Sequence, residues 1–182
     1  LRLVGSEMCI RDSCTTLNVN LARREADIAL RLSRPTQEDL IIKRLSFIHL
    51  GLYASVDYVD RFGLPKDSLA GHQMILFANV RPFRRENDWL EARMDGARVA
   101  LRSDSVSATY SATVAGTGIA LLPCHVADHD RHLVRVPVEG GPEPRQIWQA
   151  VHKDLRDSAR IRAVLDFLGK VLVVPQEAAS AA

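Results

Sequence analysis

Residues 99–123 are VALRSDSVSATYSATVAGTGIALLP, and this stretch decides the fold class. The apolar run at its start predicts a strand, and Ser103 is the candidate N-cap of a helix that Gly116 ends. A second apolar run, residues 119–122, predicts a buried strand that Pro123 closes. The stretch is therefore a strand–helix–strand unit, which is typical of α/β layering.

The same alternation extends outward in both directions. Further strands are predicted at residues 26–30, 45–47, 50–53, 74–77, 133–138 and 147–151. Further helices are predicted at residues 56–62, between Ser55 and Gly63, and at residues 161–168, the clearest amphipathic pattern. A helix is expected to end near Leu21, and residues 81–87 are expected to form a polar loop. The order predicts an α/β fold with largely parallel strands.

Size and composition limit the classes of function. A chain of 182 residues is long enough for one domain or two small lobes. A net charge of +2 gives no electrostatic reason for tight nucleic-acid binding, and no apolar run approaches the roughly 18 residues of a membrane span. Three cysteines (Cys9, Cys14, Cys124) do not make a disulfide framework. With no visible signal peptide, we expect a cytoplasmic location, and the start at Leu1 suggests a fragment.

Two predicted strand ends supply candidate ligand-binding residues. Ser103, Asp104 and Ser105 lie where a strand passes into a helix, and helix starts offer free N–H groups to a carboxylate. Asp104 would repel an anion unless it points away, and Ser103 is equally explained as a plain N-cap. Arg31 directly follows the strand at residues 26–30 and can pair with an acid, or it is a surface arginine beside an acidic residue. Phe77 is either an apolar wall of the site or core.

Other chemistries are weighed and set aside. The densest group of possible metal ligands comprises Cys124, His125, Asp128, His129, Asp130 and His132. His125 and His129 have helical zinc-site spacing, but the glutamate of the zinc-protease motif is missing, so a surface helix is the preferred interpretation. The Gly116-x-Gly118 pair lacks the third glycine of a dinucleotide loop, and no nucleophile elbow is present. We therefore expect no catalytic residue, metal or cofactor.

Residues 1–16 differ from the rest of the chain. They show no helical or strand period, and residues 4–13 (VGSEMCIRDS) resemble translated sequencing-adaptor sequence. We expect this segment to be foreign to the fold and assign it no function. The Ala- and Ser-rich residues 176–182 are expected to be a disordered tail.

Four blocks, in order, resemble the LysR-type bacterial transcription regulators. They are residues 21–35 (LARREADIALRLSRP), 50–65 (LGLYASVDYVDRFGLP), 99–123, and 160–172 (RIRAVLDFLGKVL). The resemblance implies the C-terminal effector-binding part of such a regulator, with two periplasmic-binding-protein-like lobes of type II. Lobe one would comprise residues 17–46 and 145–175 and lobe two residues 47–144, with the glycine- and proline-rich residues 140–144 as a crossover. The resemblance to LysR-type regulators also implies that Arg31 faces the cleft between the lobes.

The resemblance sets the expected partners as well. The effector would be a small organic acid or aromatic compound, and the full-length regulator would be a dimer or tetramer that reaches DNA through an N-terminal helix-turn-helix absent from this chain. Lobe one would then lack its first strand–helix units, so we expect the isolated chain to be marginally stable or prone to aggregate. The alternative is a solute-binding protein of a transport system with the same architecture. Coding sequence upstream of Leu17 would distinguish the two.

Overall fold

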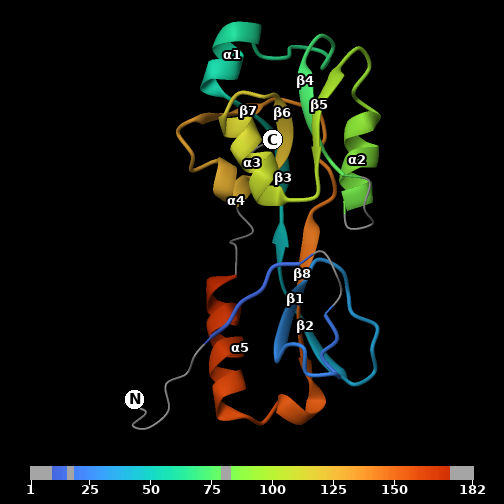
Figure 1. Cartoon of the computed structure of the whole chain (residues 1–182), viewed down its shortest axis with the longest axis vertical. Coiled ribbons are helices and arrows are strands. Elements are labelled where there is room, and N and C mark those ends of the chain that lie inside the picture. The colour runs from blue at the N-terminus through green and yellow to red at the C-terminus, as the bar shows by residue number, and fades with distance from the viewer. Residues whose placement is uncertain (1–9, 16–18, 79–82, 173–182) are drawn as a thin grey trace. The chain divides into compact units, whose positions relative to one another are not determined.

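The chain folds into two compact units. The computed structural model describes residues 10–15, 19–78 and 83–172 (Figure 1). The described residues up to Ser46 and from Gln146 onward form unit 1, and Phe47–Arg145 form unit 2. The chain therefore passes between the units twice. Most of the predicted foreign segment and the whole of the predicted tail lie outside the described residues.

Unit 1 is a small sheet followed by a helix. Its strands are β1 (Ile28–Arg31), β2 (Leu40–Ile48) and β8 (Arg145–His152), in the order β1-β8-β2, and β1 runs antiparallel to β8. The 3-10 helix η2 (Lys153–Leu155) and α5 (Ala159–Val171) follow β8. α5 buries Ile161 and leaves Phe167 exposed, which confirms the predicted amphipathic helix.

Unit 2 contains a five-stranded sheet with the order β5-β4-β6-β3-β7. Its strands are β3 (Leu50–Ser55), β4 (Gln73–Phe77), β5 (Arg98–Ser103), β6 (Ile119–Pro123) and β7 (Leu133–Val136). Its helices are α1 (Val56–Phe62), α2 (Arg84–Glu91), α3 (Val106–Val114) and α4 (Cys124–Ala127). The predicted strand–helix–strand unit at residues 99–123 is confirmed as β5, α3 and β6.

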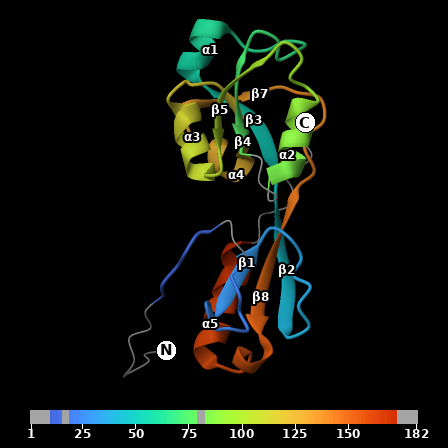
Figure 2. The same cartoon turned by 45° about the vertical axis from the view of Figure 1, so that its right-hand side comes forward.

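Helices cover both faces of the unit 2 sheet because its central strands are apolar on both sides. One face buries Leu52, Met74 and Leu121 against α1 and α2, and the alternate residues Tyr53 and Ile75 bury the other face against α3 and α4. In Figure 2, α2 and α3 lie on opposite sides of the strands. The result is a three-layer α/β unit.

The two glycines after α3 each have a structural reason. Gly116 has a φ of +75°, the left-handed conformation that ends many helices. A Cβ at Gly118 would lie 2.6 Å from the carbonyl oxygen of Gln73, so β6 can approach β4 only if this position has no side chain. The Gly-x-Gly pair therefore serves a turn and a close strand contact.

The expectation of largely parallel strands is only partly correct. In unit 2, β4 pairs in parallel with both β5 and β6, whereas β3 pairs antiparallel with β6 and with β7. Parallel neighbours need a crossover connection, and α2 supplies it between β4 and β5.

Two local predictions are wrong. The expected helix end near Leu21 is a turn: Asn20 Oδ1 accepts hydrogen bonds from the amides of Ala22 and Arg23, so an asparagine side chain satisfies the donors that a helix would use. Leu17 lies outside the described residues. The expected loop at residues 81–87 overlaps α2, which begins at Arg84.

Candidate functional site

The candidate site lies where two parallel strands of unit 2 end. The register of β4 and β5 sets Phe77 opposite Ser103, and each is the last residue of its strand. The amide of Ala78 donates to the carbonyl oxygen of Ser103 over 2.7 Å, which holds the two ends together. Open α/β sheets bind ligands at this kind of edge, where parallel strands give way to loops and helix starts.

The turn between β5 and α3 is held by its own serines. Ser105 is the N-cap of α3, and its Oγ accepts a hydrogen bond from the amide of Ala108 over 3.2 Å. Ser103 Oγ accepts from the amide of Ser105 over 3.1 Å. The predicted N-cap at Ser103 is therefore wrong by two residues, because β-pairing continues through Ser103 and delays the start of the helix.

Asp104 and Ser105 are exposed at this turn, and Ser103 is half-buried. The first amides of a helix have no partner within the helix, and the helix dipole is positive there. A carboxylate ligand would meet these donors, but it would also meet the negative charge of Asp104. The turn can thus bind a polar group, with Asp104 as the residue that opposes an anion.

Phe77 belongs to the core of unit 2. It is 5% exposed, and its ring stacks on that of Phe83 with centroids 4.2 Å apart. The side chain of Asn87 forms two hydrogen bonds with the backbone of Phe77. Its Nδ2 donates to the Phe77 carbonyl oxygen over 2.8 Å, and its Oδ1 accepts from the Phe77 amide over 3.2 Å. The sequence allowed two roles for Phe77, a core residue or an apolar wall of the ligand site. The observed packing is that of a core residue, and contact with a ligand stays a prediction.

A buried ion pair adjoins this aromatic stack. Arg145 Nε lies 3.1 Å from Glu86 Oε1, and its guanidinium carbon is 5.8 Å from the ring centroid of Phe83. Glu86 is only 3% exposed, and its Oε2 has no hydrogen-bond partner among the described residues. Burial lowers the pKa of Arg145, and the charge of Glu86 opposes that shift.

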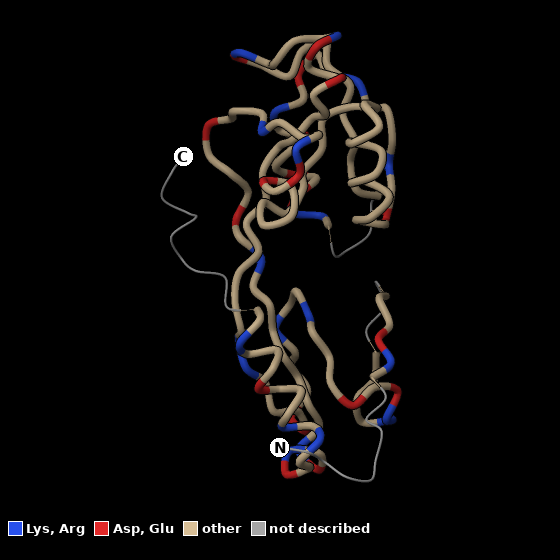
Figure 3. The backbone as a smooth tube through the Cα atoms, turned by 90° about the vertical axis from the view of Figure 1, so that its left-hand side faces the viewer, with Lys and Arg blue, Asp and Glu red and all other residues tan. Residues whose placement is uncertain are grey.

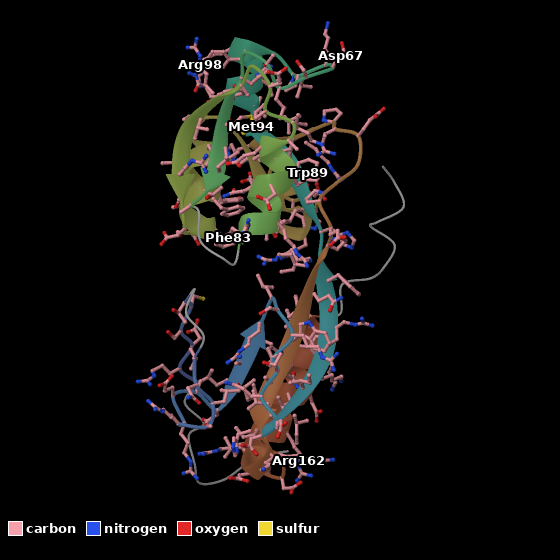
Figure 4. All side chains as sticks on the ribbon, turned by 90° about the vertical axis from the view of Figure 1, so that its right-hand side faces the viewer. Asp67, Phe83, Trp89, Met94, Arg98 and Arg162 are labelled. Atoms are coloured by element: carbon pink, nitrogen blue, oxygen red, sulfur yellow. The ribbon has the colours of Figure 1, made fainter. Side chains whose placement is uncertain are left out.

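Sequence reasoning missed Glu86 and Asn87 because it assigned residues 81–87 to a loop, and it missed Arg145 because the strand it predicted begins at residue 147. The signal was present: Phe83, Leu90 and Met94 are spaced for one face of a helix and pack together in the core. Figure 4 shows Phe83 beside the start of α2, with Trp89 on the helix and Met94 beyond its end. Charged residues between these positions hid the pattern.

Arg31 is the one candidate that lies in unit 1, at the carboxyl end of β1. Its guanidinium donates a hydrogen bond to the carbonyl oxygen of Val19 over 2.6 Å. The surface interpretation predicted that Arg31 pairs with an acidic side chain. The partner in the structure is instead a backbone carbonyl. The structure brings together Phe77 and residues 103–105 in unit 2 and places Arg31 in the other unit.

The histidine- and acid-rich segment after β6 forms hydrogen bonds within unit 2. Tyr53 donates to Asp128 over 2.5 Å, and Tyr110 donates to Asp130. Asp130 also accepts from the amide of His132 over 2.8 Å. Within the described ranges, no three His, Cys, Asp or Glu side chains come close enough to share a metal ion. These carboxylates instead tie the segment to β3 and α3.

Charged residues of both signs occur in each unit. Positions of lysine and arginine are interspersed with positions of aspartate and glutamate along the backbone of each unit (Figure 3). None of the described helices combines the length and apolar composition needed to cross a membrane.

The sequence matches a known family over nearly its whole length. The model of the LysR substrate binding domain covers residues 11–173. The chain belongs to the LysR substrate-binding domain family. The match begins inside the segment that the sequence predicts to be foreign. Among curated relatives, the HTH-type transcriptional regulator CrgA of Neisseria meningitidis serogroup C (strain 8013) is 28% identical over 160 residues, which is 82% of this chain and 52% of that protein. The LysR domain described here therefore spans about half the length of the curated relatives it matches.

Solved structures agree on the fold of this LysR domain. The regulatory domain of CrgA from Neisseria meningitidis superimposes with a TM-score of 0.72 at 24% identity, covering 85% of this chain and 79% of that one. The Synechocystis PCC6803 CcmR regulatory domain, solved in complex with 2-PG, gives a TM-score of 0.62 at 22% identity, covering 84% and 76%. These likenesses confirm the predicted two-lobed fold of the type II periplasmic-binding-protein kind.

Proposed function

We propose that this LysR domain senses a small organic acid or aromatic compound, and that unit 1 and unit 2 are its two lobes. The ligand would bind at the carboxyl ends of β4 and β5, against the turn at residues 103–105. Arg31 of unit 1 is a further candidate contact, which the family resemblance implies. The single observation that carries the proposal is the paired ending of β4 and β5 at Phe77 and Ser103, directly before the capped start of α3. A solved relative of this fold holds 2-PG, which supports a small ligand here too.

Each site residue has a proposed role. Ser103 and Ser105 would present hydroxyl groups and the first amides of α3 to a polar group of the ligand. Arg31 would supply a guanidinium that can pair with a carboxylate through two hydrogen bonds. The aromatic stack of Phe77 on Phe83 would support the apolar part of the ligand. Binding would act by favouring one arrangement of the lobes over another.

The wider role follows from the family. We propose that the domain carries out no catalysis and that it serves a full-length regulator that assembles as a dimer or tetramer in the cytoplasm. Contact with DNA would be made by a helix-turn-helix outside this chain, which agrees with the mixed charge along both units. The family match favours this role over that of a transport solute-binding protein.

Calorimetric titration with a panel of small carboxylic acids and aromatic compounds tests the proposal. The panel is titrated into the unaltered chain and into Ser103→Ala and Arg31→Ala. Ser111→Ala, on an exposed position farther along α3, and Arg23→Ala, in the exposed turn, are the matched controls. We expect one compound class to bind and both site variants to weaken it by about tenfold, the value of one charge-assisted hydrogen bond. Equal affinity in Ser103→Ala and Ser111→Ala would exclude the strand-end site, and equal affinity in Arg31→Ala would remove Arg31.

A further inference from the structure

Unit 1 contains a hollow of its own, away from the strand ends of unit 2. Its volume is about 150 Å³, and its lining comprises Leu21, Ala22, Arg24, His152, Asp154 and Leu155. One water molecule occupies about 30 Å³ in the liquid, so the hollow has room for a group of several heavy atoms. All of the lining comes from two segments: the turn before β1 and the end of β8 with η2.

The turn that supplies Arg24 is held in one conformation. Asn20 Oδ1 accepts hydrogen bonds from the amides of Ala22 and Arg23, and the amide of Arg24 donates to the carbonyl oxygen of Leu21 over 3.1 Å. Arg24 has a φ of 58°, the left-handed region that residues other than glycine, asparagine and aspartate rarely adopt. The turn therefore fixes the backbone of Arg24, whose side chain belongs to the lining of the hollow.

The opposite wall supplies a second donor. His152 Nδ1 accepts a hydrogen bond from the amide of Asp154 over 3.3 Å. In the neutral imidazole that accepts at Nδ1, the hydrogen is on Nε2, which is then a donor. Asp154 Oδ2 lies 3.4 Å from the same Nδ1. Because Nδ1 has no hydrogen in this tautomer, the Asp154 carboxylate does not bind it, and this side chain is 67% exposed to solvent.

Apolar side chains complete the hollow. Leu21 is 1% exposed and Leu155 is half-buried, so one side is shielded from water. Among the described residues, Arg24 has no acidic side chain within ion-pair distance. A guanidinium and an imidazole N–H donor beside an apolar surface form a site that an oxyanion completes, since charge-assisted hydrogen bonds are stronger where water is partly excluded.

We propose that this hollow is a second small-molecule site that binds a small oxyanion, either a carboxylate or a phosphate group, between Arg24 and His152. This inference goes beyond the effector site at the strand ends and does not depend on it. The two sites share no residue, so an experiment can contradict one proposal and leave the other standing.

Titration with simple anions, followed by the imidazole NMR signals of the intact chain, tests this site. The probes are inorganic phosphate and, separately, acetate, each compared with sodium chloride at equal ionic strength. His152→Gln assigns the signal of His152 among the six histidines. Arg24→Asn removes the guanidinium with a residue that tolerates the left-handed backbone. Arg23→Asn is the matched control, because Arg23 is the neighbouring exposed arginine and does not line the hollow.

The expected result is a saturable shift of the His152 signal with at least one anion but not with chloride. Arg24→Asn should weaken that binding at least about tenfold, and Arg23→Asn should leave it unchanged. Preference for phosphate or acetate identifies which oxyanion the site takes. If Arg24→Asn does not fold, Arg24→Lys keeps the charge and should retain weaker, saturable binding. No saturable shift, or equal weakening by the Arg23 and Arg24 variants, overturns the proposal.

Discussion

Ser105 shows how a single hydroxyl group can set both stability and site geometry. It caps α3, and its own amide is bound by Ser103 Oγ. We predict that Ser105→Ala lowers the free energy of unfolding by about 1 kcal/mol, the usual cost of losing an N-cap, whereas Ser105→Asn retains most of it. Urea unfolding of the three chains measures this. Equal stability of the alanine and asparagine variants would show that the cap contributes nothing.

Asp104 is predicted to oppose acidic ligands. Its exposed carboxylate lies between the two serines at the start of α3, where it adds negative charge to the turn. Asp104→Asn should therefore strengthen the binding of a carboxylate ligand by a few-fold, the size of an exposed charge–charge interaction, and leave an uncharged aromatic ligand unaffected. Calorimetry with one ligand of each kind measures the difference. A gain for both ligands, or for neither, contradicts this electrostatic role.

Asp130 should make the stability of unit 2 depend on acid pH. The hydrogen bond from Tyr110, followed by that from the amide of His132, holds the pKa of Asp130 below its ordinary value of 3.8. The folded state therefore prefers the ionised carboxylate. This stabilisation is complete above the unfolded pKa and is lost as the pH falls through the lower folded pKa. Asp130→Asn should show a smaller loss of stability between pH 5 and pH 3 than the unaltered chain, measured by urea unfolding at each pH. Parallel pH profiles would refute the assignment.

At the scale of elements, the Glu86–Arg145 pair joins α2 to the first residue of β8. Removing one partner leaves the other buried and charged, which costs about 3–5 kcal/mol. We predict a loss of that size for Glu86→Leu. The double variant Glu86→Leu/Arg145→Met should recover much of it, because an apolar pair leaves no unpaired charge. Thermal unfolding measures both. A double variant less stable than the single variant would contradict this view of the pair.

The elements also show how far sequence patterns reach. Apolar runs predict β4 and β6 because those strands are buried on both faces, whereas β5, which an apolar run also predicts, is a mostly exposed edge strand. The pattern cannot decide which residue of Ser103, Asp104 and Ser105 caps α3, since each is a good N-cap, and the pairing of β5 with β4 makes that choice. α2 is harder to recognise than β4 or β6, because its buried positions include the polar Glu86 and Asn87 beside Leu90. The hollow around Arg24 joins residues 21–24 to residues 152–155, a contact that no local pattern contains.

For the molecule as a whole, unit 1 is expected to limit stability. β1 lies at the end of its sheet order, and Leu30 and Leu32 near it are 47% and 41% exposed. Exposed apolar side chains beside a strand edge favour association between chains. We predict that heating the isolated chain gives an irreversible transition whose midpoint falls as the protein concentration rises. A sharp, reversible melt that is independent of concentration would contradict this.

The central claim is that a small ligand binds where β4 and β5 end, at the start of α3. Hydrogen–deuterium exchange, with and without the compound that binds in calorimetry, tests this most directly. The account predicts slower exchange on binding at the amides of Ala78 and of residues 103–108, with little change in the later turns of α3. Binding without protection of these amides would contradict it.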